Sequence, residues 1–124
     1  MPYQTTLEAH GLVTTFSGQL SGAELRHAVF HQYKDYRSDD VRYVIDDFLK
    51  VAVLDVSEQA LDDILALLLS AHFENADVRV ALVATDGRIK TFADHVASPD
   101  LPSYPTRVFT SLAEARVWIG PLAA

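Results

Sequence analysis

Three aspartates that follow apolar segments are the first side chains in this chain that could do chemistry. Asp46 and Asp47 come directly after residues 41–45, and Asp86 follows residues 78–84. Ligand sites in open α/β sheets lie at the carboxyl ends of the strands, so three carboxylates gathered there could hold Mg²⁺ together with water. Aspartates also serve as turn and capping residues, and Asp86 opens an Asp-Gly pair that is common in turns. We favour the turn interpretation and keep an acidic Mg²⁺-dependent enzyme as the last of three functional hypotheses.

A histidine pair has a spacing that can hold a metal ion. His27 and His31 stand four residues apart in a segment with helical periodicity, and Glu24 lies on the same side. Leu25 and Val29 occupy the opposite side, so the histidines should face water. The sequence has no His-Glu-x-x-His arrangement to supply a general base. We interpret the pair as a solvated helix face and expect neither a cofactor nor a metal.

The segment 58–73 carries more apolar residues than a surface helix needs. At helical spacing they cover an arc of roughly 240°. One interpretation is a helix wedged between the sheet and a neighbouring helix. The other is a homodimer face or the rim of an apolar pocket, with dimerisation ahead of ligand binding. Together with the one tryptophan, which could line a pocket, the ligand or interface candidates are Leu61, Ile64, Leu67, Leu69, Phe73 and Trp118.

Alternating sheet and helix signals supply the elements that must position these residues. β-Rich segments predict strands over residues 3–7, 11–17, 41–45, 78–84 and 107–110. Helical spacing and capping signals predict helices from Ser21 to about Lys34, over 58–73, over 87–96, and from Ser111 to Ile119. Residues 51–56 are apolar and fit either a short strand or the approach to the next helix.

The order β-β-α-β-α-β-α-β-α predicts an α/β fold with a mixed sheet of four to five strands and four helices. The first two strands can pair as a hairpin, and strands that alternate with helices should be parallel. Residues 78–84 form a nearly continuous apolar run, which predicts a central strand buried on both faces. The length of 124 residues suits one domain over residues 1–124.

Composition removes several classes of function. The net charge is −7, with ten basic residues scattered among seventeen acidic ones, so binding to nucleic acid is disfavoured. The chain has no cysteine, which excludes disulfides, thiolate catalysis and Cys-ligated zinc. The N-terminus lacks the pattern of a signal peptide, and the longest apolar run, residues 65–69, is far too short to span a bilayer. We expect a cytoplasmic protein without a stable membrane anchor.

Four segments resemble the SpoIIAA-like (STAS-like) family. The closing strand of the family looks like residues 104–109 of this chain. Its terminal helix, which carries an alanine and a tryptophan, looks like residues 111–119. Residues 41–46 are similar to its central strand, and residues 79–83 to its "RvAvV" strand. The resemblance covers roughly residues 7–119 and implies a non-enzymatic role in binding partners, often controlled by serine phosphorylation at the start of a helix. Related sheets of the CRAL-TRIO type hold lipids.

Ser57 is the candidate for such a phosphorylation switch. The motif of the family runs Asp-Ser-x-Gly, whereas this chain reads Asp55-Val56-Ser57-Glu58, so only the aspartate fits. A phosphate on Ser57 would meet the positive end of a helix dipole but also the charges of Asp55 and Glu58. We therefore interpret Ser57 as a structural N-cap.

Two further hypotheses come ahead of the acidic enzyme. The first is a non-catalytic binding or regulatory domain that forms a homodimer through the helix over residues 58–73 and has a protein as its other partner. The second is a carrier for a small apolar ligand, such as a fatty acid or lipid, in the manner of a CRAL-TRIO domain.

Overall fold

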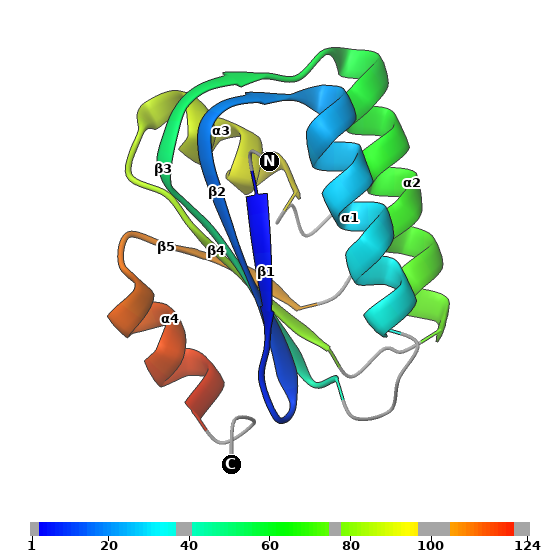
Figure 1. Cartoon of the computed structure of the whole chain (residues 1–124), viewed down its shortest axis with the longest axis vertical. Helices are drawn as coiled ribbons and strands as arrows, with labels where there is room; N and C mark the ends of the chain where they lie inside the picture. The colour runs from blue at the N-terminus through cyan, green and yellow to red at the C-terminus, as the bar shows by residue number, and fades with distance from the viewer. Residues whose placement is uncertain (1–2, 37–40, 75–77, 97–104, 121–124) are drawn as a thin grey trace.

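Five strands form one mixed sheet with helices on both faces in the computed structural model, which describes residues 3–36, 41–74, 78–96 and 105–120 (Figure 1). The expected order of elements is confirmed. The strands are β1 (Tyr3–Leu7), β2 (Gly11–Ser21), β3 (Tyr43–Asp55), β4 (Arg79–Val83) and β5 (Thr106–Phe109). The helices are α1 (Gly22–Tyr36), α2 (Glu58–Glu74), α3 (Gly87–Val96) and α4 (Leu112–Ile119).

The strands lie in the order β1-β2-β3-β4-β5 across the sheet. β1 and β2 pair antiparallel as the expected hairpin, and the three other pairings are parallel. Strand β4 lies between β3 and β5, and residues 80–83 are buried on both of its faces, as the continuous apolar run predicts.

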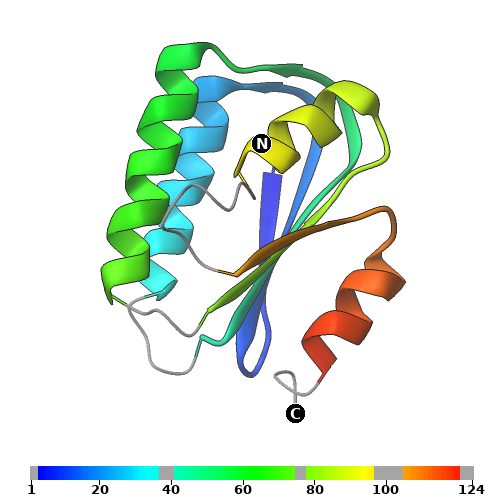
Figure 2. The ribbon, with the colours of Figure 1, turned by 180° about the vertical axis from the view of Figure 1, so that it is seen from behind.

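Helices α1, α2 and α3 cover one face of the sheet, and α4 covers the other (Figures 1 and 2). Successive side chains of a strand point to opposite faces, so each strand contributes to two cores. On β3, Val44 and Phe48 join the core under the three helices, while Tyr43 and Ile45 join the core under α4. The larger core contains two stacked rings, Phe16 and Phe48, whose centroids lie 4.7 Å apart.

Strand β3 is much longer than the segment 41–45 that the sequence predicts. It continues to Asp55 beside β2, which in turn extends to Ser21, and the ribbon of two strands curves over the top of the molecule in Figure 1. Its register with β2 shifts twice, because β3 advances one residue more than β2 at each irregularity. The inward side chains therefore recur every third residue, at Phe48, Val51 and Leu54. This part of the sequence thus lacks the alternation of apolar and polar residues that indicates a regular strand. The ambiguous residues 51–56 thus belong to this strand up to Asp55.

The helix starts follow the serines that the sequence singled out. The hydroxyl of Ser21 accepts a hydrogen bond from the Glu24 N–H at 3.2 Å, and the Glu24 carboxylate accepts one from the Ser21 N–H at 3.0 Å. This reciprocal pair is the expected capping box. Ser111 caps α4 in the same way by accepting a hydrogen bond from the Glu114 N–H at 3.2 Å.

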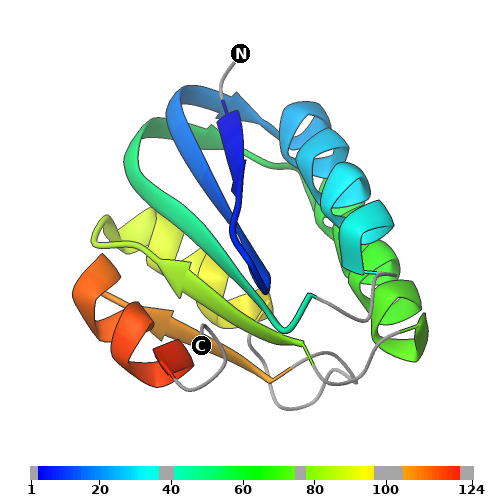
Figure 3. The ribbon, with the colours of Figure 1, turned by 60° about the horizontal axis from the view of Figure 1, so that its bottom comes forward.

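A glycine at the start of α1 lets this helix approach α2. A Cβ atom on Gly22 would lie 2.6 Å from the Cβ of Ala60 on α2, closer than two carbon atoms can pack. The two helices therefore lie side by side with their N-terminal turns nearly in contact (Figure 3).

Candidate functional site

A groove on the outer surface of the α1–α2 pair is the candidate site. It encloses about 400 Å³ and is lined by Ala23, Arg26, His27, Phe30 and Leu67. The first four come from α1 at helical spacing, and Leu67 comes from α2. The side that α1 turns toward the sheet carries Leu25, Ala28, Val29 and Gln32, all buried. The lining residues of α1 therefore lie on its opposite, outer side.

An exposed aromatic ring forms part of the groove. The side chain of Phe30 is 44% exposed although it is large and apolar. The ammonium of Lys34 lies 5.0 Å from the centroid of this ring, one turn further along α1. Leu67 is only partly buried and packs against the edge of the large core. The groove is thus apolar at its centre and carries cationic side chains along α1.

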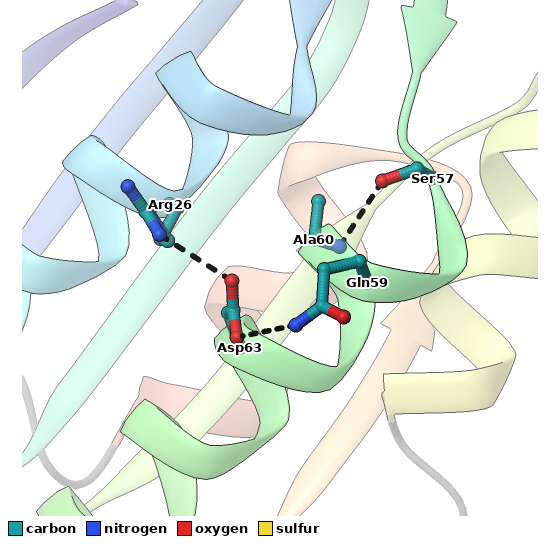
Figure 4. Close-up of polar contacts among 5 residues, drawn as sticks. All are labelled: Arg26, Ser57, Gln59, Ala60 and Asp63. Atoms are coloured by element: carbon teal, nitrogen blue, oxygen red, sulfur yellow. Dashed lines mark hydrogen bonds and ion pairs between the residues drawn. The ribbon is translucent and has the colours of Figure 1, made fainter.

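Exposed charged side chains of opposite sign lie on the two helices. Exposed Arg26 and Lys34 lie on α1, whereas exposed Glu58 and Asp62 lie on α2. Close to the N-terminal ends of both helices, Arg26 reaches Asp63 at 3.3 Å (Figure 4). Arg26 thus lines the groove with Asp63 of α2 beside it, in a chain whose net charge is −7.

Ser57 caps α2. Its hydroxyl accepts a hydrogen bond from the Ala60 N–H at 3.1 Å, and its carbonyl accepts one from the Leu61 N–H at 2.9 Å (Figure 4). The Gln59 amide donates to Asp63 at 3.2 Å within the same turns. Ser57 is exposed, so its hydroxyl combines a capping contact with access to solvent. A phosphorylation switch at Ser57 stays a prediction.

The interface candidates of α2 separate into inner and outer residues. Ile64 is 1% exposed and belongs to the core, so its selection as a ligand or interface residue is corrected: the intact fold leaves it no surface to offer. Leu61 and Leu67 are partly buried at the edge of the same core. The side chains of Leu69 and Phe73 lie outside the described residues. The wide apolar arc thus arises in part because α2 contacts both α1 and the core.

Trp118 lies on α4, across the sheet from the groove. Its ring packs against Phe109 with centroids 5.6 Å apart, and the guanidinium groups of Arg79 and Arg107 lie 5.4 and 5.6 Å from its own centroid. Arg79 also donates a hydrogen bond to the Trp118 carbonyl at 3.2 Å. Trp118 and the α2 candidates therefore cannot belong to one pocket.

The three candidate metal ligands are not brought together. Asp46 and Asp47 lie inside β3 and not after its end, which is at Asp55. They are buried on opposite faces of the sheet, since Asp46 meets α1 through Gln32 and neighbouring side chains of a strand alternate. Asp86 is exposed beyond the end of β4. Within the described ranges, no three His, Asp or Glu side chains approach one another closely enough to hold a metal ion.

A buried polar network escaped the sequence interpretation. The amide of Gln32 donates to Thr14 at 2.9 Å and to Asp46 at 2.7 Å, with all three residues buried. Burial raises the pKa of the Asp46 carboxyl to about 7, although the hydrogen bond from Gln32 works in the opposite direction. The helical spacing between Leu25 and Gln32 predicts that Gln32 lies on the inner side of α1. This spacing is the signal in the sequence from which the burial of Gln32 could have been predicted.

A second polar cluster fastens α4 to the hairpin. The two terminal nitrogens of Arg116, Nη1 and Nη2, donate to the carboxylate of Glu8 at 2.7 Å, and the Tyr43 hydroxyl donates to the same carboxylate. The hydrogen bonds from Arg116 lower the pKa of Glu8 to about 2. A side chain on Gly11 would overlap the Tyr43 ring, so a glycine in the hairpin is needed to place this tyrosine. The pairing joins residues 108 positions apart in sequence, which local patterns do not reveal.

Within the part of the chain that the structure describes, no helix is both long and apolar enough to cross a bilayer. Neither family models nor curated proteins match this sequence.

Solved structures do match the fold. An uncharacterized protein of the DUF3478 family with a SpoIIAA-like fold, from Shewanella loihica PV-4, aligns with a TM-score of 0.60 and 18% identity over 94% of this chain and 90% of its own. The anti-sigma factor antagonist SpoIIAA in its unphosphorylated form aligns with a TM-score of 0.61 and 11% identity. This alignment covers 96% of this chain and 97% of SpoIIAA. The Bacillus cell fate determinant SpoIIAA in the phosphorylated form aligns with a TM-score of 0.55 and 13% identity, over 94% of this chain and 98% of its own. The chain therefore has the SpoIIAA-like fold that its sequence resembles.

Proposed function

We propose that this protein is a single, non-enzymatic regulatory domain of the cytoplasm that binds protein partners and forms a homodimer through the α1–α2 groove. The fold is shared with an anti-sigma factor antagonist, a protein that acts through other proteins. The observation that carries the proposal is the apolar centre of the groove, formed by exposed Phe30 and partly buried Leu67. Burying such a surface against a second copy contributes about 25 cal/mol for each Å² of apolar area.

The charges beside the groove favour a second copy of this chain as the occupant. In a symmetric dimer the same patch of both copies meets itself. A twofold axis along the groove would set α1 of one copy against α2 of the other. Arg26 of each copy would then lie level with Asp63 of the other copy, the residue that it contacts at 3.3 Å within its own chain. Such complementarity fixes the orientation of the copies and accelerates their association.

Sedimentation velocity of the full chain tests the dimer. We expect a dimer at micromolar concentration that dissociates in Phe30→Glu and in Leu67→Glu, because each variant places a carboxylate in the apolar centre. The matched control is Val117→Glu, since Val117 is 80% exposed on α4 at the other face. This control should stay dimeric. A wild-type protein that sediments as a monomer, or a dimer that both groove variants leave unchanged, would refute self-association through this groove.

A second candidate function is the transport of a small apolar ligand. The volume of about 400 Å³ lies in the range of small-molecule sites. Arg26 and His27 could pair with the carboxylate or phosphate of an amphipathic ligand whose chain contacts Phe30. Native mass spectrometry of gently purified protein would then show added mass that Arg26→Gln reduces. Protein that is free of ligand and gains no thermal stability across a panel of fatty acids would exclude this function.

A further inference from the structure

The geometry points to a two-histidine chelating site on α1 for a divalent transition-metal ion of the zinc and copper class. The Nε2 atoms of His27 and His31 lie 3.2 Å apart, and both side chains are exposed. A zinc ion bound at about 2.0–2.1 Å from each of two imidazole nitrogens, with a tetrahedral angle between them, separates these nitrogens by about 3.4 Å. The two nitrogens need to separate by only about 0.2 Å. The rings, whose planes stand at 65° with centroids 4.4 Å apart, have to turn so that both lone pairs meet at the ion.

A tyrosine from another element holds the first histidine in the required orientation. The hydroxyl oxygen of Tyr3, on β1, lies 2.7 Å from Nδ1 of His27. This contact leaves Nε2 as the nitrogen that faces His31. Histidines that bind metals usually donate their other N–H to an oxygen, and this fixes both the tautomer and the ring orientation. With an ion bound, His27 would donate its Nδ1–H to Tyr3 and present the lone pair of Nε2.

The same contacts explain how the pair exists without an ion. One of the two Nε2 atoms can carry a proton and donate it to the other, and Tyr3 can either donate to Nδ1 of His27 or accept from it. A metal ion takes the place of this shared proton, and the displaced proton moves to a δ nitrogen as the tautomer changes. The two nitrogens are therefore held near the chelating distance before the ion arrives, and the rings turn as it binds.

The chemistry of the donors selects the ion. Neutral imidazole suits zinc, copper and nickel, whereas Mg²⁺ and Ca²⁺ require oxygen ligands. Glu24 is on the same side of α1, but its carboxylate accepts the hydrogen bond from the Ser21 N–H and is held by the capping box. The chain thus contributes two ligands, and water fills the remaining positions. His27 also lines the groove, so a donor atom of a molecule bound there could replace one of these waters.

Titration of the full chain with zinc sulfate, followed by calorimetry and by the imidazole resonances in NMR spectra, tests the site. We expect one ion per chain and shifts confined to the resonances of His27 and His31. His31→Gln should weaken binding at least tenfold, because it removes the chelate. Tyr3→Phe should weaken binding roughly tenfold, since partners of metal-bound histidines typically contribute that much. Magnesium sulfate should leave the same resonances unchanged.

His10→Gln is the control, because His10 lies in the β1–β2 turn and should not affect binding. Zinc affinity that His31→Gln leaves unchanged, or that His10→Gln lowers as strongly, would overturn the assignment. The site does not depend on the proposed homodimer.

Discussion

The two faces of the sheet each hold one carboxyl group whose pKa departs strongly from its ordinary value, and the two departures have opposite signs. Under α1, Asp46 is buried beside the neutral amide of Gln32, and burial raises its pKa to about 7. Beside α4, the guanidinium of Arg116 lowers the pKa of Glu8 to about 2. The contrast shows that the charge of the partner, and not the degree of burial alone, decides which form of a carboxyl group the fold stabilises.

The arginine–carboxylate pairs of the two faces differ in the same way. Arg116 binds Glu8 through two hydrogen bonds of 2.7 Å, and these side chains are 43% and 27% exposed. Arg26 meets Asp63 through one contact of 3.3 Å, and these side chains are 55% and 38% exposed. The first pair fixes α4 against the hairpin. The second contributes little to stability and leaves its charges in solvent, where a binding partner can use them.

The largest expected effect is the pH dependence caused by Asp46. A carboxyl group with a raised pKa binds its proton more tightly in the folded chain than in the unfolded one. Its contribution to stability is therefore complete below about pH 4 and is lost as the pH rises through about 7. Urea unfolding should show a loss of about 3 kcal/mol between roughly pH 5 and pH 8 in the wild-type protein.

Asp46→Asn should remove most of this loss, because an amide cannot ionise and can still accept the hydrogen bond from Gln32. Asp62→Asn is the control on the exposed side of α2 and should keep the pH dependence of the wild-type protein. If Asp46→Asn and the wild-type protein lose stability equally as the pH rises, the buried carboxyl is not the titrating group.

The pairing at α4 should respond to pH in the opposite direction. The pKa of Glu8 is lowered from 4.5 to about 2, so its contribution is complete above about pH 4.5 and is lost as the pH falls toward 2. Because Arg116 is partly exposed, solvent screening limits this contribution to about 1–2 kcal/mol. Glu8→Gln should lose that amount at neutral pH, and the difference from the wild-type protein should shrink in acid. An unchanged difference at low pH would show that packing, and not charge, explains the loss.

Much of the fold could be predicted because its signals are local. The capping serines Ser21 and Ser111 mark helix starts, and the apolar run of β4 predicts its central position. Strand β3 could not be predicted in full, because two shifts in register against β2 turn an alternating pattern into one that repeats every third residue. The same error placed Asp46 and Asp47 at the end of a strand and suggested a metal site that the structure does not assemble.

The candidate site was only partly visible in the sequence. The leucine-rich segment pointed to α2, but which of its residues face outward depends on where α1 lies, and this depends on the close approach at Gly22. The groove itself consists mostly of α1 residues, whose spacing predicts a solvated helix face. The hydrogen bond between His27 and Tyr3 joins residues 24 positions apart in sequence, so the spacing of residues within α1 does not reveal it.

A smaller effect is expected at the start of α2. Ser57→Ala removes the hydroxyl that accepts the Ala60 N–H and should cost about 1 kcal/mol of stability in urea unfolding. Ser57→Asp keeps a capping oxygen and should stay within about 0.3 kcal/mol of the wild-type protein. Because Ser57 does not line the groove, we expect Ser57→Asp to remain dimeric. A monomeric but stable Ser57→Asp variant would instead support a switch controlled by phosphorylation.

The smallest effect on stability, and the sharpest contrast between the two faces, is expected at Arg26. Arg26→Gln removes a single exposed ion pair with Asp63 and should change the free energy of unfolding by less than about 0.5 kcal/mol. Arg116→Gln should cost about 1–2 kcal/mol, because it breaks the bidentate pair with Glu8. In sedimentation the order should reverse: Arg26 lines the groove, so Arg26→Gln should weaken the dimer, whereas Arg116→Gln should leave it intact. If the dimer is equally strong in both variants, the charges of the α1–α2 face play no part in its association.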